Sequence, residues 1–279
     1  AGKHLMERFH RSGGIPAVMQ ELMKQKKLHT KVMTVSGKTL EQNLKIKLNI
    51  DKDVIKSFDN PVVDKAGFIV MRSNFFNSAI MKTSVISEEF RKRYLSNPDH
   101  PNVFEVKAVM FEGPEDYHHR INSSKLKIDE HSILMVRGCG PVGYPGSAEV
   151  VNMQPPNRLL KQGINALPTL GDGRQSGTSE SPSILNVSPE SAVGGDLAIV
   201  KTGDTIKIDL NKSRVDLLIS AAEFKKRRKK KKLPKLINQT PWQEIARNTV
   251  GQLEDGACIN SRGVYLDISK KKGIPRNSH

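Results

Sequence analysis

The sequence is poor in cysteine, in aromatic residues and in long apolar runs, and each shortage excludes a class of protein. Only two cysteines, Cys139 and Cys258, occur among 279 residues, too few for a disulfide framework or a zinc site with cysteine spacing. This cysteine usage is typical of a reducing compartment, so we expect a cytoplasmic protein. The longest apolar runs, such as 68–71 and 197–200, are far too short to cross a bilayer. No secretory signal pattern follows Ala1, so neither a leader nor membrane association is expected.

Basic residues outnumber acidic ones by 45 to 29, which leaves a formal net charge of +16. Eight of the positive charges form one uninterrupted block, Lys225–Lys232. A block of like charges is typical of a solvated, mobile loop. It is also compatible with a nuclear-import or polyanion-binding patch. No aromatic residue interrupts the block, so a base-stacking surface is not indicated and nucleic acid is not an expected partner.

The first 60 residues have helical character. Residues 15–23 place Ile15, Val18, Met19 and Leu22 on one stripe, which predicts an amphipathic helix. A second short helix is expected to begin at Ser36. The sequence pattern changes from Pro61 onward, where short runs of β-branched residues alternate with turns.

The second part of the chain predicts a β-rich domain with peripheral helices, either a barrel or a sandwich. Strands are expected at 67–71, 103–111, 133–136, 197–200, 205–210 and 215–219. The last two of these form a predicted hairpin. Helices are expected at 87–94 and 243–253.

Two glycine-rich segments, Gly138–Gly146 and Gly171–Gly177, have the composition of loops that build a site. Each is associated with a polar side chain, Glu149 for the first and Ser176 for the second. Glycine lets a ligand approach the main chain closely, and loops on a rigid scaffold commonly carry function. The alternative is that both segments are ordinary surface turns.

Seven segments of the chain carry a resemblance to known sequences: Ser78–Asn97, Phe111–Ile121, Gly140–Asn152, Gly171–Leu185, Ser188–Gly195, Thr240–Leu253 and Gly273–His279. They resemble the dihydroxy-acid dehydratase/6-phosphogluconate dehydratase family, and in particular its branch of pentonate (arabinonate and xylonate) dehydratases. Together they extend over most of the sequence.

The resemblance implies an α+β architecture. Residues 61–279 would form a C-terminal β-barrel domain of the swivelling type, flanked by helices. Residues 1–60 would be a helical remnant, the C-terminal end of an N-terminal α/β domain. In the family, that N-terminal domain carries an iron–sulfur cluster, [2Fe–2S], on three cysteines and most of a magnesium site. Full-length relatives assemble as homodimers or homotetramers.

The resemblance also implies roles for four residues. Glu149 matches the glutamate that completes the magnesium shell, in keeping with the preference of Mg²⁺ for carboxylate oxygen. Ser176 matches the serine that removes the C2 proton as an alkoxide. Thr178 matches a neighbouring hydroxyl that holds substrate, and His279 matches a terminal histidine that assists proton transfer. The implied reaction is dehydration of a sugar acid to a 2-keto-3-deoxy acid.

Some residues depart from the family pattern. Neither Cys139 nor Cys258 matches a cluster ligand, so Cys139 is expected to pack in the interior. Glu180 replaces a glycine and adds a negative charge close to Thr178. We therefore expect the chain to be an N-terminally truncated fragment that is inactive alone. The alternatives are a non-catalytic relic and a protein that binds polyanions through Lys225–Lys232.

Overall fold

The computed structural model describes residues 3–62, 67–176 and 182–260. The chain divides into two compact units, residues 1–66 and 67–279, and each is described by itself. The assignment of residues 1–60 to an N-terminal domain and of 61–279 to a C-terminal domain stays a prediction. In the part of the chain that is described, no helix combines the length and apolarity needed to cross a membrane.

The first unit contains three helices, α1 (Met6–Arg11), α2 (Gly14–Lys24) and α3 (Leu40–Asn43). Helix α2 confirms the amphipathic helix predicted over residues 15–23. The prediction that the next helix begins at Ser36 is wrong, because Thr39 caps it. The Thr39 hydroxyl accepts from the Gln42 N–H at 3.3 Å, and the Gln42 side chain accepts from the Thr39 N–H at 2.8 Å. This reciprocal capping box sets where α3 starts.

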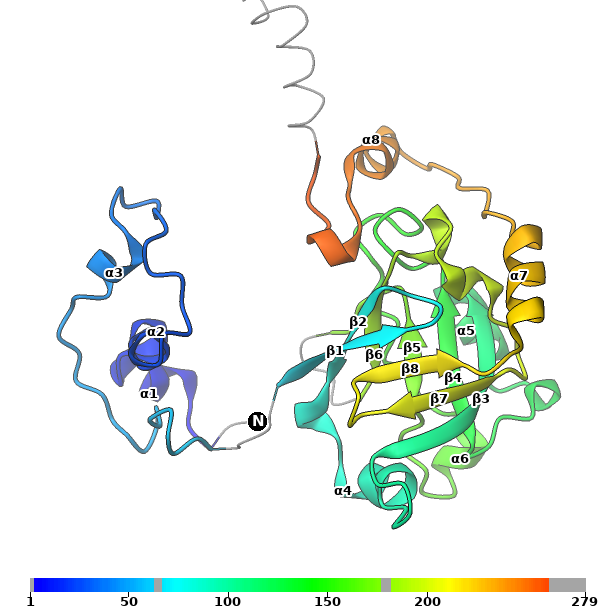
Figure 1. Cartoon of the computed structure of the whole chain (residues 1–279), viewed down its shortest axis with the longest axis horizontal. Coiled ribbons are helices and arrows are strands. Elements are labelled where there is room, and N and C mark those ends of the chain that lie inside the picture. Colours follow the sequence, from blue (N-terminus) through cyan, green and yellow to red (C-terminus); the bar gives the residue numbers. More distant parts are fainter. Residues whose placement is uncertain (1–2, 63–66, 177–181, 261–279) are drawn as a thin grey trace, which may run out of the picture. The chain divides into compact units, whose positions relative to one another are not determined.

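The second unit is a closed β-barrel of mixed direction, in agreement with the expected barrel (Figure 1). Its strands follow the spatial order β1-β2-β6-β5-β4-β3-β7-β8. They are β1 (Phe68–Ser73), β2 (Ser78–Lys82), β3 (Val103–Glu112), β4 (Ser132–Arg137), β5 (Thr169–Gly171), β6 (Ile184–Ser188), β7 (Thr205–Asp209) and β8 (Arg214–Leu217). Strands β3, β4, β5 and β6 run parallel to one another, and β1 pairs in parallel with β8.

Alternation along the strands separates two apolar clusters. Met110 of β3 and Met135 of β4 belong to the cluster that fills the barrel. Their neighbours Phe111 and Val136 belong to a second cluster on the outer face. Successive side chains of a strand point to opposite faces, so strands β3 and β4 are buried on both sides. This explains why β4 reads as a continuous apolar run.

The strand predictions are largely confirmed, with one error and three omissions. The predicted hairpin is present, with Ile208 of β7 opposite Val215 of β8. The run 197–200 is not a strand. Residues Asp196–Ile199 form the 3₁₀ helix η5, whose Leu197 and Ile199 are buried. Strands β2, β5 and β6 were not predicted.

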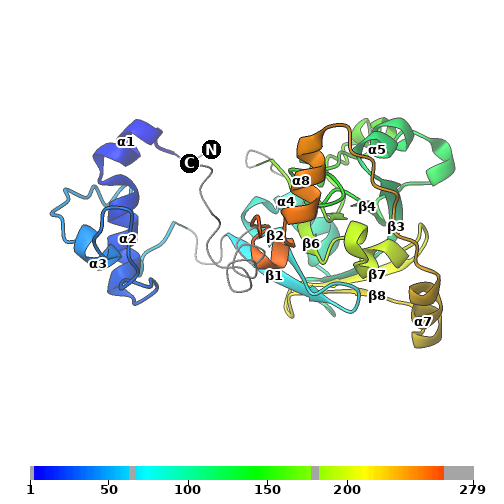
Figure 2. The ribbon, with the colours of Figure 1, turned by 90° about the horizontal axis from the view of Figure 1, so that it is seen from above.

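Helices and short helical turns surround the barrel (Figure 2). The predicted helix at 87–94 is present as α4 (Glu88–Phe90) continued by the π-helical turn η2 (Arg91–Leu95). The predicted helix at 243–253 is α8 (Pro241–Thr249), which ends four residues earlier than expected. The others are α5 (Pro114–Arg120), α6 (Asn157–Leu160), α7 (Ala221–Lys230), η1 (Thr83–Val85), η3 (Ser124–Leu126), η4 (Ser191–Val193) and η6 (Leu253–Asp255).

The basic block is mostly helix α7, so the expectation of a mobile loop is wrong. The Ser220 side chain caps the helix by accepting from the Glu223 N–H. Arg227 is only 12% exposed and forms ion pairs with Asp204 and Glu223. Arg228 and Lys231 both pair with Asp196. Three of the eight basic side chains in the block therefore form ion pairs with acidic residues of the barrel unit, so fewer positive charges are available to bind a polyanion.

Candidate functional site

The two glycine-rich segments lie side by side in the structure. Glu149 and Arg174 form a parallel β-bridge. The Arg174 N–H donates to the Ala148 carbonyl at 3.0 Å, and the Val151 N–H donates to the Arg174 carbonyl at 3.2 Å. A Cβ at Gly173 would lie 2.8 Å from the Ala148 carbonyl oxygen, so this close approach requires glycine. The segments predicted separately from the sequence are thus two halves of one structure.

A buried carboxylate, Asp172, organises the start of the first segment. Asp172 accepts hydrogen bonds from the Gly138 N–H at 3.1 Å and the Cys139 N–H at 2.8 Å. It also accepts from both the N–H and the hydroxyl of Ser191, at 2.9 and 2.6 Å. Burial raises the pKa of Asp172, and these four hydrogen bonds oppose the rise.

A second buried carboxylate, Glu190, holds the middle of the same segment. It accepts from the N–H groups of Val142 and Gly143 at 2.9 and 2.8 Å, and from the Gln252 side chain at 2.9 Å. Burial raises the pKa of Glu190 as well. A Cβ at Gly140 would lie 2.5 Å from Glu190 Oε2, so glycine is required there by the packing of this carboxylate. The two acids thus accept hydrogen bonds from four backbone N–H groups of the segment, those of residues 138, 139, 142 and 143.

Arg174 of the second segment binds Glu149, one of the predicted site residues. The Arg174 guanidinium forms an ion pair with the Glu149 carboxylate, and its Nε donates to the Ser147 carbonyl at 2.8 Å. Both side chains of the pair are about half exposed. The carboxylate of Glu149 is therefore directed by a cation of the neighbouring segment, and both remain accessible to a ligand.

Glu149 and Ser176 line two different cavities. Ser176 lines a pocket of about 490 Å³ together with Arg174, Asn186 and the outward side chains of β1 and β2. Glu149 lines a pocket of about 550 Å³ with Tyr117, His118 and Tyr144. Arg174 belongs to the first pocket and is paired with a residue of the second. The structure thus places the predicted base and the predicted metal ligand on adjacent segments.

Two predicted site residues, Thr178 and His279, lie outside the described residues. So does Glu180, which differs from the family pattern. Of the two cysteines, Cys139 is fully buried in the outer apolar cluster, as expected. Burial raises the pKa of its thiol well above the usual range, so Cys139 is held as a neutral thiol. Cys258 is exposed.

The described residues contain no group of three or more His, Cys, Asp or Glu side chains placed to hold a metal ion. Glu149 offers one accessible carboxylate, the ligand type that Mg²⁺ prefers. One carboxylate is not a complete magnesium site. These residues therefore fit Mg²⁺ only as one ligand of a shell completed by other groups.

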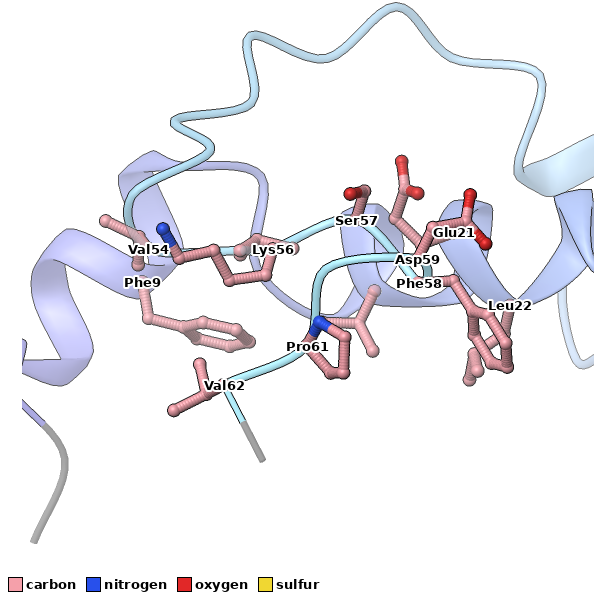
Figure 3. Close-up of a pocket in the computed structure, with 12 residues that line it drawn as sticks. Phe9, Glu21, Leu22, Val54, Lys56, Ser57, Phe58, Asp59, Pro61 and Val62 are labelled. Atoms are coloured by element: carbon pink, nitrogen blue, oxygen red, sulfur yellow. The ribbon is translucent and has the colours of Figure 1, made fainter. Parts of the chain in front are cut away.

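The first unit has a cavity of its own, of about 670 Å³, between α1, α2 and the segment 54–62. Figure 3 shows that Phe9, Pro61 and Val62 face one another across part of it. Its lining is mostly apolar, with Glu21 and Asp59 toward one end. No predicted site residue lies in it.

Sequence reasoning missed three residues of the site: Asp172, Glu190 and Arg174. Asp172 and Arg174 lie inside the second glycine-rich segment, and Glu190 lies in the segment 188–195 that carries part of the resemblance. The available signal was an acidic residue close to glycines, because irregular glycine-rich backbone has N–H groups that need an acceptor.

Comparison with known proteins identifies the family of the chain. The C-terminal domain of the dihydroxy-acid/6-phosphogluconate dehydratases matches residues 53–257, and their N-terminal domain matches residues 1–43. The chain belongs to this family. It is 55% identical over its whole length to D-xylonate dehydratase of Caulobacter vibrioides, of which it covers 47%.

Two further relatives have lower identity to the chain. The chain is 40% identical over 81% of its length to L-arabinonate dehydratase of Rhizobium leguminosarum, and 34% identical over 97% of its length to dihydroxy-acid dehydratase of Clostridium kluyveri. It covers 38% and 45% of these two proteins. The chain thus spans less than half the length of the curated relatives it matches, and corresponds to their C-terminal part.

Proposed function

We propose that this chain is the C-terminal part of a sugar-acid dehydratase, a hydro-lyase that converts an aldonate to a 2-keto-3-deoxy acid. The observation that carries the proposal is the 55% identity to D-xylonate dehydratase across the whole chain. The geometry supports it, because the residues matching the family's base and metal ligand lie on two segments joined by Arg174.

Ser176 is the proposed base that removes the C2 proton. A serine hydroxyl is a poor base in water, so its alkoxide requires a cationic surrounding. Arg174 lines the same pocket and supplies one positive charge there. A sugar-acid carboxylate entering the pocket would also be attracted by this guanidinium. Thr178 and His279 are proposed to hold substrate and to assist proton transfer.

Glu149 is the proposed ligand that this chain contributes to Mg²⁺. When bound, the magnesium ion and a [2Fe–2S] cluster would supply Lewis acidity to the substrate oxygens. Arg174 holds the Glu149 carboxylate in place and would have to share or release it for a metal. The cluster would have to be held by groups outside this chain, since neither cysteine matches a cluster ligand.

The chain alone is proposed to be inactive, because the cluster and most of the magnesium shell would come from the part of the relatives that it does not cover. We also expect the active protein to be a cytoplasmic homo-oligomer, a dimer or tetramer. Two alternatives from other classes are a non-catalytic relic and a polyanion-binding protein acting through Lys225–Lys232. The ion pairs of α7 do not favour the second.

The proposal is tested by fusing the chain behind the N-terminal part of the Caulobacter D-xylonate dehydratase. We expect 2-keto-3-deoxy acid to form from a pentonate with the chimera and not with the isolated chain. Ser176→Ala in the chimera should lower kcat by roughly 100-fold or more, as for loss of a general base. Ser84→Ala, at an exposed serine, is the matched control.

A chimera that binds its iron–sulfur cluster and dehydrates no aldonate would favour the relic. Turnover by the isolated chain would disprove the inactivity. Heparin binding that weakens steeply with salt and is abolished by neutralising Lys225–Lys232 would favour the polyanion alternative.

A further inference from the structure

A β-bulge in strand β6 controls where Asn186 points. Ser78 and Ile80 of β2 are opposite Ser188 and Leu185 of β6, so Ala79 alone faces two residues, Asn186 and Val187. Asn186 has φ of 59°, in the left-handed region that asparagine tolerates better than most residues. Bulges often lie next to active sites, where they redirect a side chain.

The bulge moves Asn186 out of the barrel interior. In a regular strand Asn186 would share a face with Ile184, which belongs to the interior cluster. Instead Val187 joins Ile184 in that cluster. Asn186 and its neighbour Leu185 both line the pocket that contains Ser176.

Asn186 is also tied to the segment that carries the proposed base. Its N–H donates to the Gly173 carbonyl at 2.8 Å, directly before Arg174. Its side-chain oxygen Oδ1 is buried, and no described residue donates a hydrogen bond to it. Buried polar atoms are normally paired, so this acceptor has unused capacity for a donor from a ligand or a water.

We propose that the Asn186 carboxamide binds a substrate hydroxyl beyond C3, which makes it a specificity-determining residue of the dehydratase. The inference rests on the proposed function. The C3 hydroxyl departs, and the proposed Lewis acids would take the oxygens near the reacting C2–C3 bond, so the contact assigned to Asn186 uses a hydroxyl farther along the substrate. The neutral amide suits a hydroxyl, whereas the Arg174 guanidinium in the same pocket suits the carboxylate.

The test is the variant Asn186→Gly in the chimeric holoenzyme. Glycine tolerates the left-handed backbone and removes the side chain with its carboxamide. We expect the KM for a pentonate to rise about tenfold or more, because a hydroxyl bond is lost. The KM or inhibition constant of a 2,3-dihydroxy acid without further hydroxyls should change less than about twofold.

A second variant, Asn186→Asp, keeps a side-chain acceptor, and aspartate also tolerates the left-handed backbone of the bulge. It should weaken both anionic ligands by charge repulsion and preserve the preference for the pentonate over the dihydroxy acid. Equal losses for both ligands in Asn186→Gly, or an unchanged KM for the pentonate, would overturn the inference. Failure of the proposed function would look different, since the unsubstituted chimera would then dehydrate no pentonate.

Discussion

At the scale of single residues, buried acids determine the shape of the site. Asp172 and Glu190 together accept seven hydrogen bonds, of which five come from backbone N–H groups of the segments 138–143 and 191. These N–H groups belong to irregular backbone, which has no helix or strand partner to satisfy it. The acids replace that partner, so they hold the segment that leads to Glu149.

Asp172→Asn should destabilise the second unit strongly. An amide has one acceptor oxygen, so either orientation of Asn places an NH₂ group against an N–H donor of the protein. We expect the free energy of unfolding to fall by about 2–4 kcal/mol, the range for breaking a buried charge-assisted network. Urea denaturation measures it. Asp99→Asn, at an exposed site, is the control and should change stability by less than about 0.5 kcal/mol.

At the scale of elements, α4 and η2 are joined to the barrel through aromatic side chains. Tyr94 packs against Phe90 and Phe104, with ring centroids 4.6 and 5.2 Å apart. Its hydroxyl donates to the Glu130 carbonyl at 2.7 Å. Burial raises the pKa of Tyr94 to about 12. The neutral phenol is therefore part of the contact between these helical turns and strand β3.

This contact predicts a loss of stability in alkali. The folded-state pKa of about 12 lies above the usual tyrosine pKa of 10.0, so the stabilisation is complete below pH 10 and is lost as the pH rises through 12. Between pH 9 and 11 the unfolding free energy should fall by about 1.4 kcal/mol more in the wild type than in Tyr94→Phe. Urea denaturation at each pH measures these free energies. If they fell equally in the two proteins, the pKa of Tyr94 would be unshifted and the prediction would be wrong.

At the scale of the whole molecule, the two units differ in how much apolar surface they bury. Among the described residues, the first unit fully buries only the hydrophobic side chains of Ala17, Leu44 and Ile55. Nine large hydrophobic side chains of this unit are exposed: Leu5, Met6, Ile15, Val32, Met33, Val35, Ile46, Phe58 and Val62. The second unit has two extensive clusters of its own.

Residues 67–279 should therefore fold without the first unit. We expect this fragment to unfold cooperatively, at a midpoint within a few degrees of the whole chain, because burial of apolar surface dominates folding. Residues 1–66 alone should show no cooperative transition. Thermal circular dichroism of the two fragments measures both outcomes. A cooperative transition in the short fragment would mean that its three helices are self-sufficient.

The sequence by itself determined five of the eight barrel strands, β1, β3, β4, β7 and β8, together with the β7–β8 hairpin and the family. Local alternation and turn residues are enough to specify β3, β4 and β7, and the glycine-rich segments carry the resemblance. Strand β5 was not predicted, because its three residues are too few to show a periodic pattern. The strand predicted at 197–200 is wrong, because an apolar run is equally compatible with a buried 3₁₀ helix.

Only the tertiary structure decided how the site is assembled. Arg174 meets Glu149, and Asp172 meets Gly138, across separations of 25 and 34 residues. No local pattern encodes such pairs, because they depend on the parallel neighbours β4, β5 and β6 bringing loop ends to one edge of the sheet. The bulge at Asn186 has the same origin. It arises from the pairing of β6 with β2, a strand about a hundred residues away in sequence.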